Sequence, residues 1–197
     1  MVDSKLASPT EHVPPPMGIV DKWTHKGVHF EVDNGFATIL LLQHEAPPDN
    51  DELLILHSAF DECARRAGHV HAIFFWVLRQ APGMSAEIAA EPASPVGEIV
   101  DKLFERLNQL PQVVVGFAES KVCSVATCLL AACDLVIVGP GVEFELLGGG
   151  IPMGLPLCLL QRLGPAVAEH VINIGPVMGV SSAVELRLVG EVLSSLQ

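Results

Sequence analysis

Positive charge is scarce in this chain. Its 197 residues include 11 Lys and Arg against 23 Asp and Glu, which gives a net charge of −12 at neutral pH. Nucleic acids and anionic membranes are recognised largely through clustered cations, so this composition excludes both as expected partners. The shortage also counts against phosphate-bearing ligands unless the few cations gather at one place. The candidates for such a cluster are Lys22, His25, Lys26, Arg79 and Lys121.

The chain also lacks paired-cysteine motifs and long apolar segments. Its cysteines show no CxxC spacing and lie mostly in apolar runs, which predicts buried thiols in a reducing compartment. The apolar run 129–138 contains Asp134 and is too short to span a bilayer, and residues 1–18 hold no apolar signal core. We therefore expect a soluble, cytoplasmic protein. His69 and His71 are spaced like metal ligands, but no third ligand follows at a readable spacing, and no metal is expected.

What the chain does contain is enough apolar material for one core. Half of its residues are hydrophobic, and its mean hydropathy is +0.44. A chain of this length and composition is expected to fold as one domain. Residues 1–18 are rich in Pro, Ser and Thr and predict a flexible lead, so we assign the domain to residues 19–197.

Strand and helix patterns alternate after this lead. Asn34-Gly35 separates two β-rich stretches within residues 28–43, and this dipeptide predicts a hairpin. Apolar residues at helical spacing predict an amphipathic helix over 51–67, and the apolar run 71–78 predicts a strand buried on both faces. A helix that connects two such strands favours a parallel sheet.

The same alternation continues through the second half of the chain. The sequence predicts a helix over 97–109 and a buried strand at 113–115. Ser124 is predicted to cap a helix over 125–132, and 135–138 is a further short strand. These patterns indicate an α/β fold. Later helices are predicted near residues 155–163, 165–172 and 181–187.

Several stretches occur in an order that resembles one known family. Along the chain these are GFATILLL, LPQVVV, ACDLVIVG, VEF, LLQRLGP and ELRLVGEVL. In this order, over about residues 28–193, the chain is similar to the crotonase, or enoyl-CoA hydratase/isomerase, superfamily. The resemblance implies a crotonase-like spiral of ββα units with short crossed sheets and surrounding helices.

The resemblance also implies a pocket for an acyl thioester of coenzyme A or of an acyl carrier protein. In the family, two backbone N–H groups stabilise an enolate oxygen, one of them at a helix N-terminus whose dipole favours negative charge. Gapless counting back from ACD places that donor at Val125, and Ala86 is the best match for the other in APGMSAE. No permanently bound cofactor is implied, because coenzyme A or phosphopantetheine enters with the substrate. Candidate contacts for its phosphates are Lys22, Lys26 and Lys121.

Departures from the family pattern bear directly on activity. Hydratases of this family use two glutamates to activate water, and the same counting places Cys128 and Gly148 at those positions. Neither residue can act as a carboxylate base. The resemblance therefore favours a decarboxylase or an enoyl isomerase of polyketide or fatty acid metabolism over a hydratase. Val125 also replaces a family glycine, and its side chain narrows the approach of a ligand.

Four other side chains have both a functional and a structural interpretation. Glu87 in the APGMSAE loop and Glu145 in VEFE are candidates for a relocated acid or base, or else are solvated carboxylates. Cys128, near a helix N-terminus, is either a reactive thiolate or a buried inert thiol. Lys121 either contacts a phosphate or forms a surface ion pair.

A second hypothesis belongs to a different functional class. A catalytically inactive crotonase-like protein that serves binding or assembly would account for the missing glutamates and for Val125. It would also fit a chain that ends shortly after Leu193, where relatives carry further helices. Apolar helices near 155–172 would then be exposed, and exposed apolar area marks interfaces. We therefore expect self-association, as a homotrimer by resemblance or as a dimer, and thioester turnover would discriminate the two hypotheses.

Overall fold

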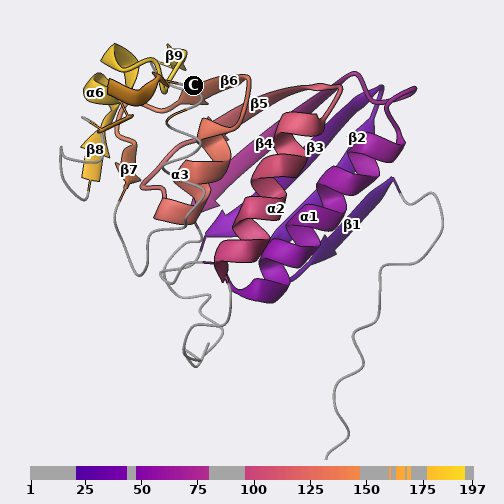
Figure 1. The fold of residues 1–197 in the computed structure, drawn as a ribbon. Helices are drawn as coiled ribbons and strands as arrows, with labels where there is room; N and C mark the ends of the chain where they lie inside the picture. Colours follow the sequence, from indigo (N-terminus) through magenta and orange to yellow (C-terminus); the bar gives the residue numbers. More distant parts are fainter. Residues whose placement is uncertain are drawn as a thin grey trace, which may run out of the picture.

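The computed structural model describes residues 21–43, 48–79, 96–146, 160, 163–166, 168–169 and 177–193. A large sheet occupies its centre, and a two-stranded sheet lies at one end (Figure 1). The small sheet pairs β7 (Glu143–Glu145) with β8 (Val177–Gly179). The large sheet contains β1 (Lys22–His25), β2 (Val28–Asp33), β3 (Phe36–Gln43), β4 (Ala72–Arg79), β5 (Val113–Ala118), β6 (Leu135–Val138) and β9 (Glu191–Val192).

The strand order of the large sheet is β1-β2-β3-β4-β5-β6-β9. The first three strands are antiparallel, and the strands from β3 to β9 in that order are parallel. Parallel neighbours need a crossover connection, which is usually a helix. The crossovers contain α1 (Asn50–Arg65), α2 (Val96–Gln109) and α3 (Ser124–Ala131). The predicted α/β fold is confirmed, and the carboxyl ends of β3, β4, β5 and β6 meet at one edge.

The hairpin predicted from Asn34-Gly35 is confirmed. These residues connect β2 to β3, and both have positive φ angles, 48° and 82°. Asn and Gly adopt this left-handed conformation more readily than other residues, as a two-residue hairpin turn requires. The strands pair from Asp33 opposite Phe36 at the turn.

A capping box begins α1. The Asp49 carboxylate accepts from the Glu52 N–H at 2.8 Å, and the Glu52 carboxylate accepts from the Asp49 N–H at 2.9 Å. The helix spans one residue more at its start, and two fewer at its end, than the predicted 51–67. Differences of this size are normal for helix ends. α1 and α2 lie side by side across one face of the sheet (Figure 1).

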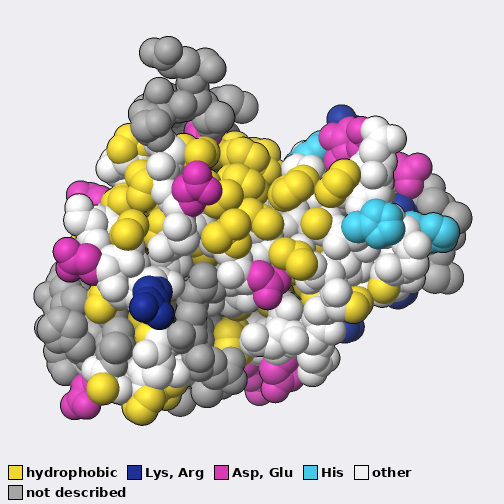
Figure 2. Space-filling view, turned by 90° about the horizontal axis from the view of Figure 1, so that it is seen from above, with side chains coloured by type: hydrophobic (Ala, Val, Ile, Leu, Met, Phe, Trp, Pro, Cys, Tyr) yellow, Lys and Arg dark blue, Asp and Glu magenta, His cyan; other side chains and the backbone are white. Residues whose placement is uncertain are grey.

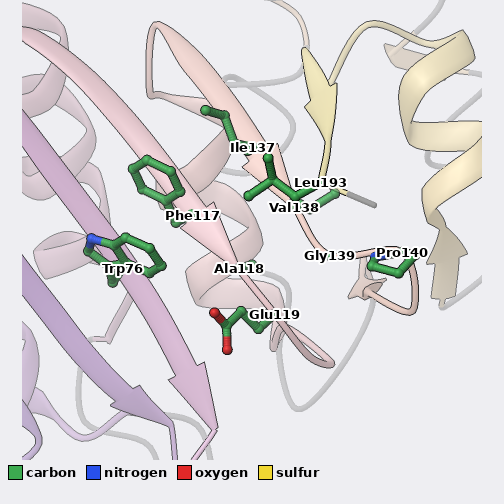
Figure 3. Close-up of a pocket in the computed structure, with 9 residues that line it drawn as sticks. All are labelled: Trp76, Phe117, Ala118, Glu119, Ile137, Val138, Gly139, Pro140 and Leu193. Atoms are coloured by element: carbon green, nitrogen blue, oxygen red, sulfur yellow. The ribbon is translucent and has the colours of Figure 1, made fainter. Parts of the chain in front are cut away.

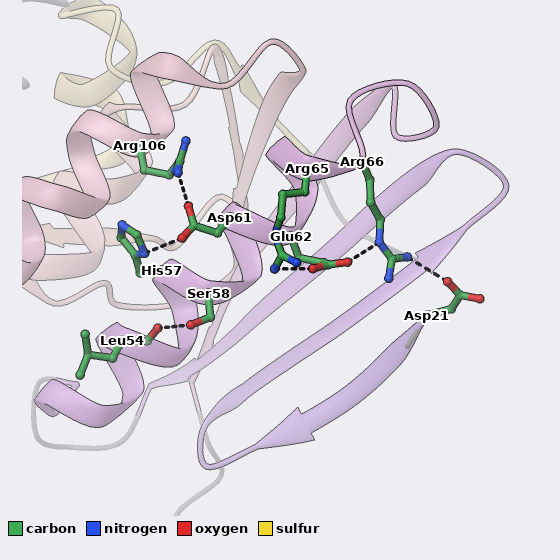
Figure 4. A network of polar contacts seen from close by, with 9 residues as sticks. All are labelled: Asp21, Leu54, His57, Ser58, Asp61, Glu62, Arg65, Arg66 and Arg106. Carbon is green, nitrogen blue, oxygen red and sulfur yellow. Dashed lines mark hydrogen bonds and ion pairs between the residues drawn. The ribbon is translucent and has the colours of Figure 1, made fainter. Parts of the chain in front are cut away.

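Polar contacts on the outer side of α1 connect it to its neighbours (Figure 4). Asp61 pairs with Arg106 of α2 and lies 3.3 Å from His57 Nδ1. Arg66, just beyond α1, lies 2.9 Å from Asp21. Partly exposed ion pairs contribute at most about 1 kcal/mol each. The apolar faces of the helices therefore contribute more to their packing than this network does.

The two faces of the large sheet differ in burial. Alternate residues of β4, such as Phe75, are fully buried on the side that α1, α2 and α3 cover. The intervening residues are partly exposed on the opposite side, which we call the open face. Successive aromatic rings contact one another along it, with Trp76 stacked on Phe117 at 4.2 Å between centroids. The apolar side chains of the open face include Phe36, Leu40, Phe74, Trp76, Val113, Phe117, Leu135 and Ile137.

Apolar side chains also reach the surface of the molecule in quantity. Seen from above, they gather across the middle of the view, while the histidines lie together at one end (Figure 2). The large apolar residues of the open face with the highest exposed fractions are Val113, Phe36 and Leu135, at 54%, 45% and 37%. Large exposed apolar areas on a soluble domain mark interaction surfaces.

Short strands at the edges of the large sheet were not predicted. β1 has four residues and β9 has two, and only their pairing with β2 and β6 defines them. The last predicted helix, near 181–187, corresponds to α6 (Val180–Glu185). The lead 1–18 lies outside the described residues. Of the helices predicted over 155–163 and 165–172, only residues 160, 163, 165, 166, 168 and 169 are described, and all six are helical. Within the described part, no helix is long and apolar enough to cross a membrane.

Gly116 in β5 is predicted not to tolerate a side chain. A Cβ at this position would lie 2.7 Å from Leu130 Cδ2 in α3 and 3.0 Å from Cys133 Sγ. Gly116→Ala should lower the free energy of unfolding by about 1–3 kcal/mol, the usual cost of overpacking, in urea denaturation. Gly141→Ala is the matched control, because nothing lies within 4 Å of a Cβ there. Equal stability of the two variants would contradict the close packing of α3 on β5.

Candidate functional site at the amino end of helix α3

The amino end of α3 lies close after the carboxyl end of β5. All eight residues of α3 are buried, as expected of a helix that the core encloses on every side. The first N–H groups of an α-helix have no acceptor within the helix. The prediction that Ser124 caps this helix is wrong. Cys123 is the capping residue, because it has the extended backbone of a cap (φ −70°, ψ 162°), and the helix begins at Ser124.

The connection from β5 to α3, residues 119–123, is held from two sides. The Val122 N–H donates to the Glu143 carbonyl in β7, and the Val122 carbonyl accepts from the Glu145 N–H, both at 2.8 Å. On the other side, the side-chain amide of Gln43 lies 3.2 Å from the backbone of both Lys121 and Cys123. The amino end of α3 is therefore anchored to β3 and to β7.

The thiol of Cys123 lies beside the N–H groups of Val125 and Ala126. Burial raises the pKa of this thiol, and the two N–H groups oppose that shift because they would donate to a thiolate. Burial is the larger cause, so the pKa of Cys123 is above its ordinary value. The amino end of α3 thus presents hydrogen-bond donors in surroundings that disfavour a charged thiolate.

The structure places two of the predicted site residues on this helix. Val125, the predicted N–H donor, is the second residue of α3 and is 4% exposed. Cys128 lies one turn further along and is fully buried. The second predicted donor, Ala86, lies outside the described residues, as do Glu87 and Gly148.

Glu145 lies beside the same connection, at the end of β7. Its carboxylate is 2.7 Å from Lys121 Nζ, and the two side chains are 29% and 44% exposed. Lys121 therefore forms a surface ion pair, which was the alternative to a phosphate contact. The pair places one carboxylate and one ammonium group near the amino end of α3.

The other predicted phosphate contacts lie at the far end of the sheet. Lys22 in β1 is 3.0 Å from Glu31, and Lys26 after β1 is 2.5 Å from Asp51. The hydrogen bond with Asp51 is the main cause that raises the pKa of Lys26. Three strands separate β1 from β5, so the structure does not bring Lys22 and Lys26 to Lys121. Among the residues described, no group of three His, Cys, Asp or Glu is placed to hold a metal ion.

Two residues of the site were missed in the sequence. Gln43 ends β3 and is only 5% exposed, and Cys123 caps α3. A sequence signal for Gln43 was available, because this glutamine is at a position where the alternation of β3 predicts a buried apolar residue. No sequence signal distinguished Cys123 from the other cysteines, since its role depends on where α3 begins.

A cavity of about 230 Å³ lies on the open face at the carboxyl ends of β5 and β6 (Figure 3). The stacked rings of Trp76 and Phe117 form one wall, and Glu119 is the only ionisable residue among the described residues that line it. Such a wall suits a flat or apolar group. None of the described residues that line the cavity belongs to α3. The other lining residues are Ala118, Ile137, Val138, Gly139, Pro140 and Leu193.

Solved structures share this fold, although no protein-family model and no curated protein sequence matches the chain. One is an enoyl-CoA hydratase/isomerase from Marinobacter aquaeolei, with a TM-score of 0.66 and 18% identity over 86% of this chain and 71% of that one. An enoyl-CoA hydratase from Mycobacterium smegmatis gives 0.66 and 20% over 86% and 70%. An enoyl-CoA hydratase/carnithine racemase from Magnetospirillum magneticum gives 0.67 and 16% over 87% and 69%. The predicted resemblance in fold is confirmed.

Slow alkylation of two thiols is predicted from their surroundings. Burial raises the pKa of Cys63 to about 12 and also raises the pKa of Cys123. Because the thiolate is the reactive form, iodoacetamide near neutral pH should label both at least about tenfold more slowly in the folded protein than in denaturing urea. Peptide mass spectrometry measures each rate. Equally fast labelling of Cys123 in both states would contradict the raised pKa described for it.

Proposed function

We propose that this chain is an acyl-thioester enzyme that stabilises an enolate through backbone N–H groups. The observation that carries the proposal is the amino end of α3, where the Val125 and Ala126 N–H groups lie together next to a neutral thiol. The fold shared with enoyl-CoA hydratases and isomerases supports it. Enclosure of α3 in the core supports it as well, because hydrogen bonds to a developing charge are stronger where water is excluded.

In the proposed mechanism, the thioester oxygen accepts hydrogen bonds from the Val125 N–H and the Ala86 N–H. When a bond breaks at the carbon next to the thioester carbonyl, its electron pair stays on that carbon and is delocalised onto the carbonyl oxygen. The product is an enolate, whose oxygen carries negative charge. The two donors and the dipole of α3 stabilise this negative charge. A neutral thioester carbonyl can enter such a site more easily than an anion, because burial penalises a full charge before the reaction begins.

Decarboxylation or double-bond isomerisation fits the described residues better than hydration does. Hydration in this family needs two carboxylates, and Cys128 is a fully buried thiol in place of one of them. In decarboxylation, the bond to carbon dioxide breaks, its electrons form the enolate, and a proton then adds to the carbon, so no base is needed at the start. Isomerisation must remove one proton and return another, and Glu145 and Glu87 are the candidate groups.

The proposal specifies the pantetheine thioester that coenzyme A and acyl carrier proteins share. A phosphate at Lys121 would have to compete with Glu145, which already lies 2.7 Å away. Lys22 and Lys26 are likewise paired with carboxylates. Both carriers therefore belong in the first experiment, and their relative turnover decides between them.

Val125 variants test the N–H donor directly. Malonyl-, glutaconyl- and enoyl-type thioesters on coenzyme A and on a carrier protein are incubated with the protein, and product masses separate decarboxylation from hydration. Proline is tolerated in the first turn of a helix, so Val125→Pro removes the N–H while allowing α3 to form. Loss of one such donor should lower kcat about 10²–10³-fold. Ala86→Pro should have a similar effect on the second donor.

Val125→Ala is the matched control for this experiment. It keeps the N–H and removes only two methyl groups, so turnover should persist, and it should rise if the Val125 side chain narrows the approach of the ligand. Equal turnover by wild type and Val125→Pro would rule out catalysis at this donor. Absence of turnover with every thioester would rule out the proposed activity.

A second candidate function is binding or assembly without catalysis, and the open face is the observation that favours it. Three of its apolar residues are more than a third exposed, although the opposite face is packed under helices. We propose that a homotrimer or a dimer forms and covers part of this apolar area. Stable interfaces of this kind have apolar centres.

Self-association is therefore predicted at micromolar concentrations. Light scattering after size exclusion should give a mass above that of one chain, which is 21.0 kDa. Val113→Lys and Leu135→Lys add a charge to the open face and should lower that mass. Leu54→Lys is the control, because Leu54 is similarly exposed, at 43%, but lies on α1. A monomeric wild type would contradict the prediction.

A further inference from the structure

Gln43 lies at a position of β3 where the other buried side chains are apolar. Burial alternates along β3, and Ala37, Ile39, Leu41 and Gln43 all lie on the face that the helices cover. Gln43 is 5% exposed. A buried amide costs free energy unless hydrogen bonds satisfy it. The hydrogen-bond partners of Gln43 therefore indicate which part of the structure its side chain stabilises.

Those partners are backbone groups 78 and 80 residues further along the chain, at Lys121 and Cys123. With its oxygen towards the Cys123 N–H and its nitrogen towards the Lys121 carbonyl, the amide makes two hydrogen bonds of 3.2 Å. In the opposite orientation, the amide nitrogen would face the Cys123 N–H and the amide oxygen would face the Lys121 carbonyl, so neither hydrogen bond could form. The orientation of a side-chain amide is assigned from such neighbours. The amide also lies 2.8 Å from Cys123 Sγ.

The side-chain amide of Gln43 and the backbone of β7 bond to successive residues of the connection 119–123. Gln43 bonds to Lys121 and Cys123, and Val122 between them bonds to β7 in both directions at 2.8 Å. Such bonding from two sides fixes the backbone direction in which α3 begins. The Val125 N–H follows only two residues after Cys123, so the direction of that N–H depends on the same hydrogen bonds.

We propose that Gln43 is a positioning residue that aims the Val125 N–H at the thioester oxygen. The inference rests on the proposed function, since it assigns the donor the role given there. Gln43 does not touch the reacting atoms. It acts through the backbone of residues 121–123, and displacement of a donor by about 1 Å is enough to slow catalysis markedly.

Two substitutions at Gln43 and one elsewhere test this role. Gln43→Met keeps the length of the side chain and removes both hydrogen bonds. Gln43→Glu can restore them only when protonated, because a neutral carboxylic acid both donates and accepts. Gln112→Met is the matched control. Gln112 is also a buried glutamine, 6% exposed, but its amide donates to the Cys63 carbonyl at 2.7 Å and does not contact residues 121–123.

The first measurement does not depend on activity. Amide hydrogen exchange by NMR should be about tenfold faster at Val125 and Ala126 in Gln43→Met than in wild type. Gln112→Met should leave these amides unchanged once the exchange rates are corrected for global stability. Unchanged exchange at Val125 and Ala126 in Gln43→Met would overturn the positioning role, whatever the wild type catalyses.

The second measurement is thioester turnover. Gln43→Met should lower kcat about ten- to a hundredfold with little change in KM, because the carbonyl still binds but its donor is misdirected. Gln43→Glu should recover towards wild type as the pH falls and its buried carboxyl becomes protonated. A proportional rise in KM with unchanged kcat would overturn the inference. Faster exchange in Gln43→Met, together with a wild type that turns over no thioester, would instead reject the proposed function, and the role of Gln43 in catalysis with it.

Discussion

The burial of α3 is the constraint on which the candidate site depends. The helix has no exposed side, and Gly116 lets it approach β5 so closely that a single methyl group would not fit. An enclosed helix of this kind cannot shift without opening the core around it. Its amino end is consequently fixed near the carboxyl edge of the parallel strands, and the N–H groups there are oriented before any ligand arrives. Such preorganised donors are what enolate chemistry requires.

Burial and hydrogen bonding oppose each other at this helix end. The N–H groups of Val125 and Ala126 favour negative charge, while the surroundings penalise it, and at Cys123 the penalty is the larger effect. This balance suits a carbonyl group that is neutral when it binds at these N–H groups and acquires charge only during the reaction. The chain as a whole is acidic, and the lysines predicted to contact phosphate already have carboxylate partners. For the proposed activity, recognition through the acyl and pantetheine parts of a thioester is therefore more consistent with this surface than recognition through phosphate.

The large sheet separates the molecule into two sides with different physical roles. The side under α1, α2 and α3 contains the core and the candidate site, whereas the open face carries a row of contacting aromatic rings and the cavity beside Trp76. The proposed catalysis at α3 and the proposed assembly through the open face are thus compatible, because they use opposite sides of the sheet. The ion pairs around α1 are partly exposed and contribute little to either role.

Local sequence signals determined most of the fold. The Asn34-Gly35 turn, the helical spacing in α1 and α2 and the apolar runs of β4 and β5 each specify their own backbone, because turn geometry and side-chain periodicity act over a few residues. The order of motifs was enough to predict the crotonase-like architecture. The edge strands β1 and β9 were not predictable in this way, since so few residues form a strand only beside a partner.

Tertiary structure decided how the candidate site is assembled. The sequence indicated Val125 and Cys128 by their distance from ACD, but it did not show that Cys123 caps α3 or that Lys121 pairs with Glu145. It also gave no indication that Gln43 reaches residues 121–123, because that contact joins the ends of two strands far apart in the chain. The burial alternation of β3 includes Gln43 among its buried positions, although this was not predicted from the sequence. Only the parallel packing of β3, β4 and β5, which brings their carboxyl ends to one edge, determined what its amide holds.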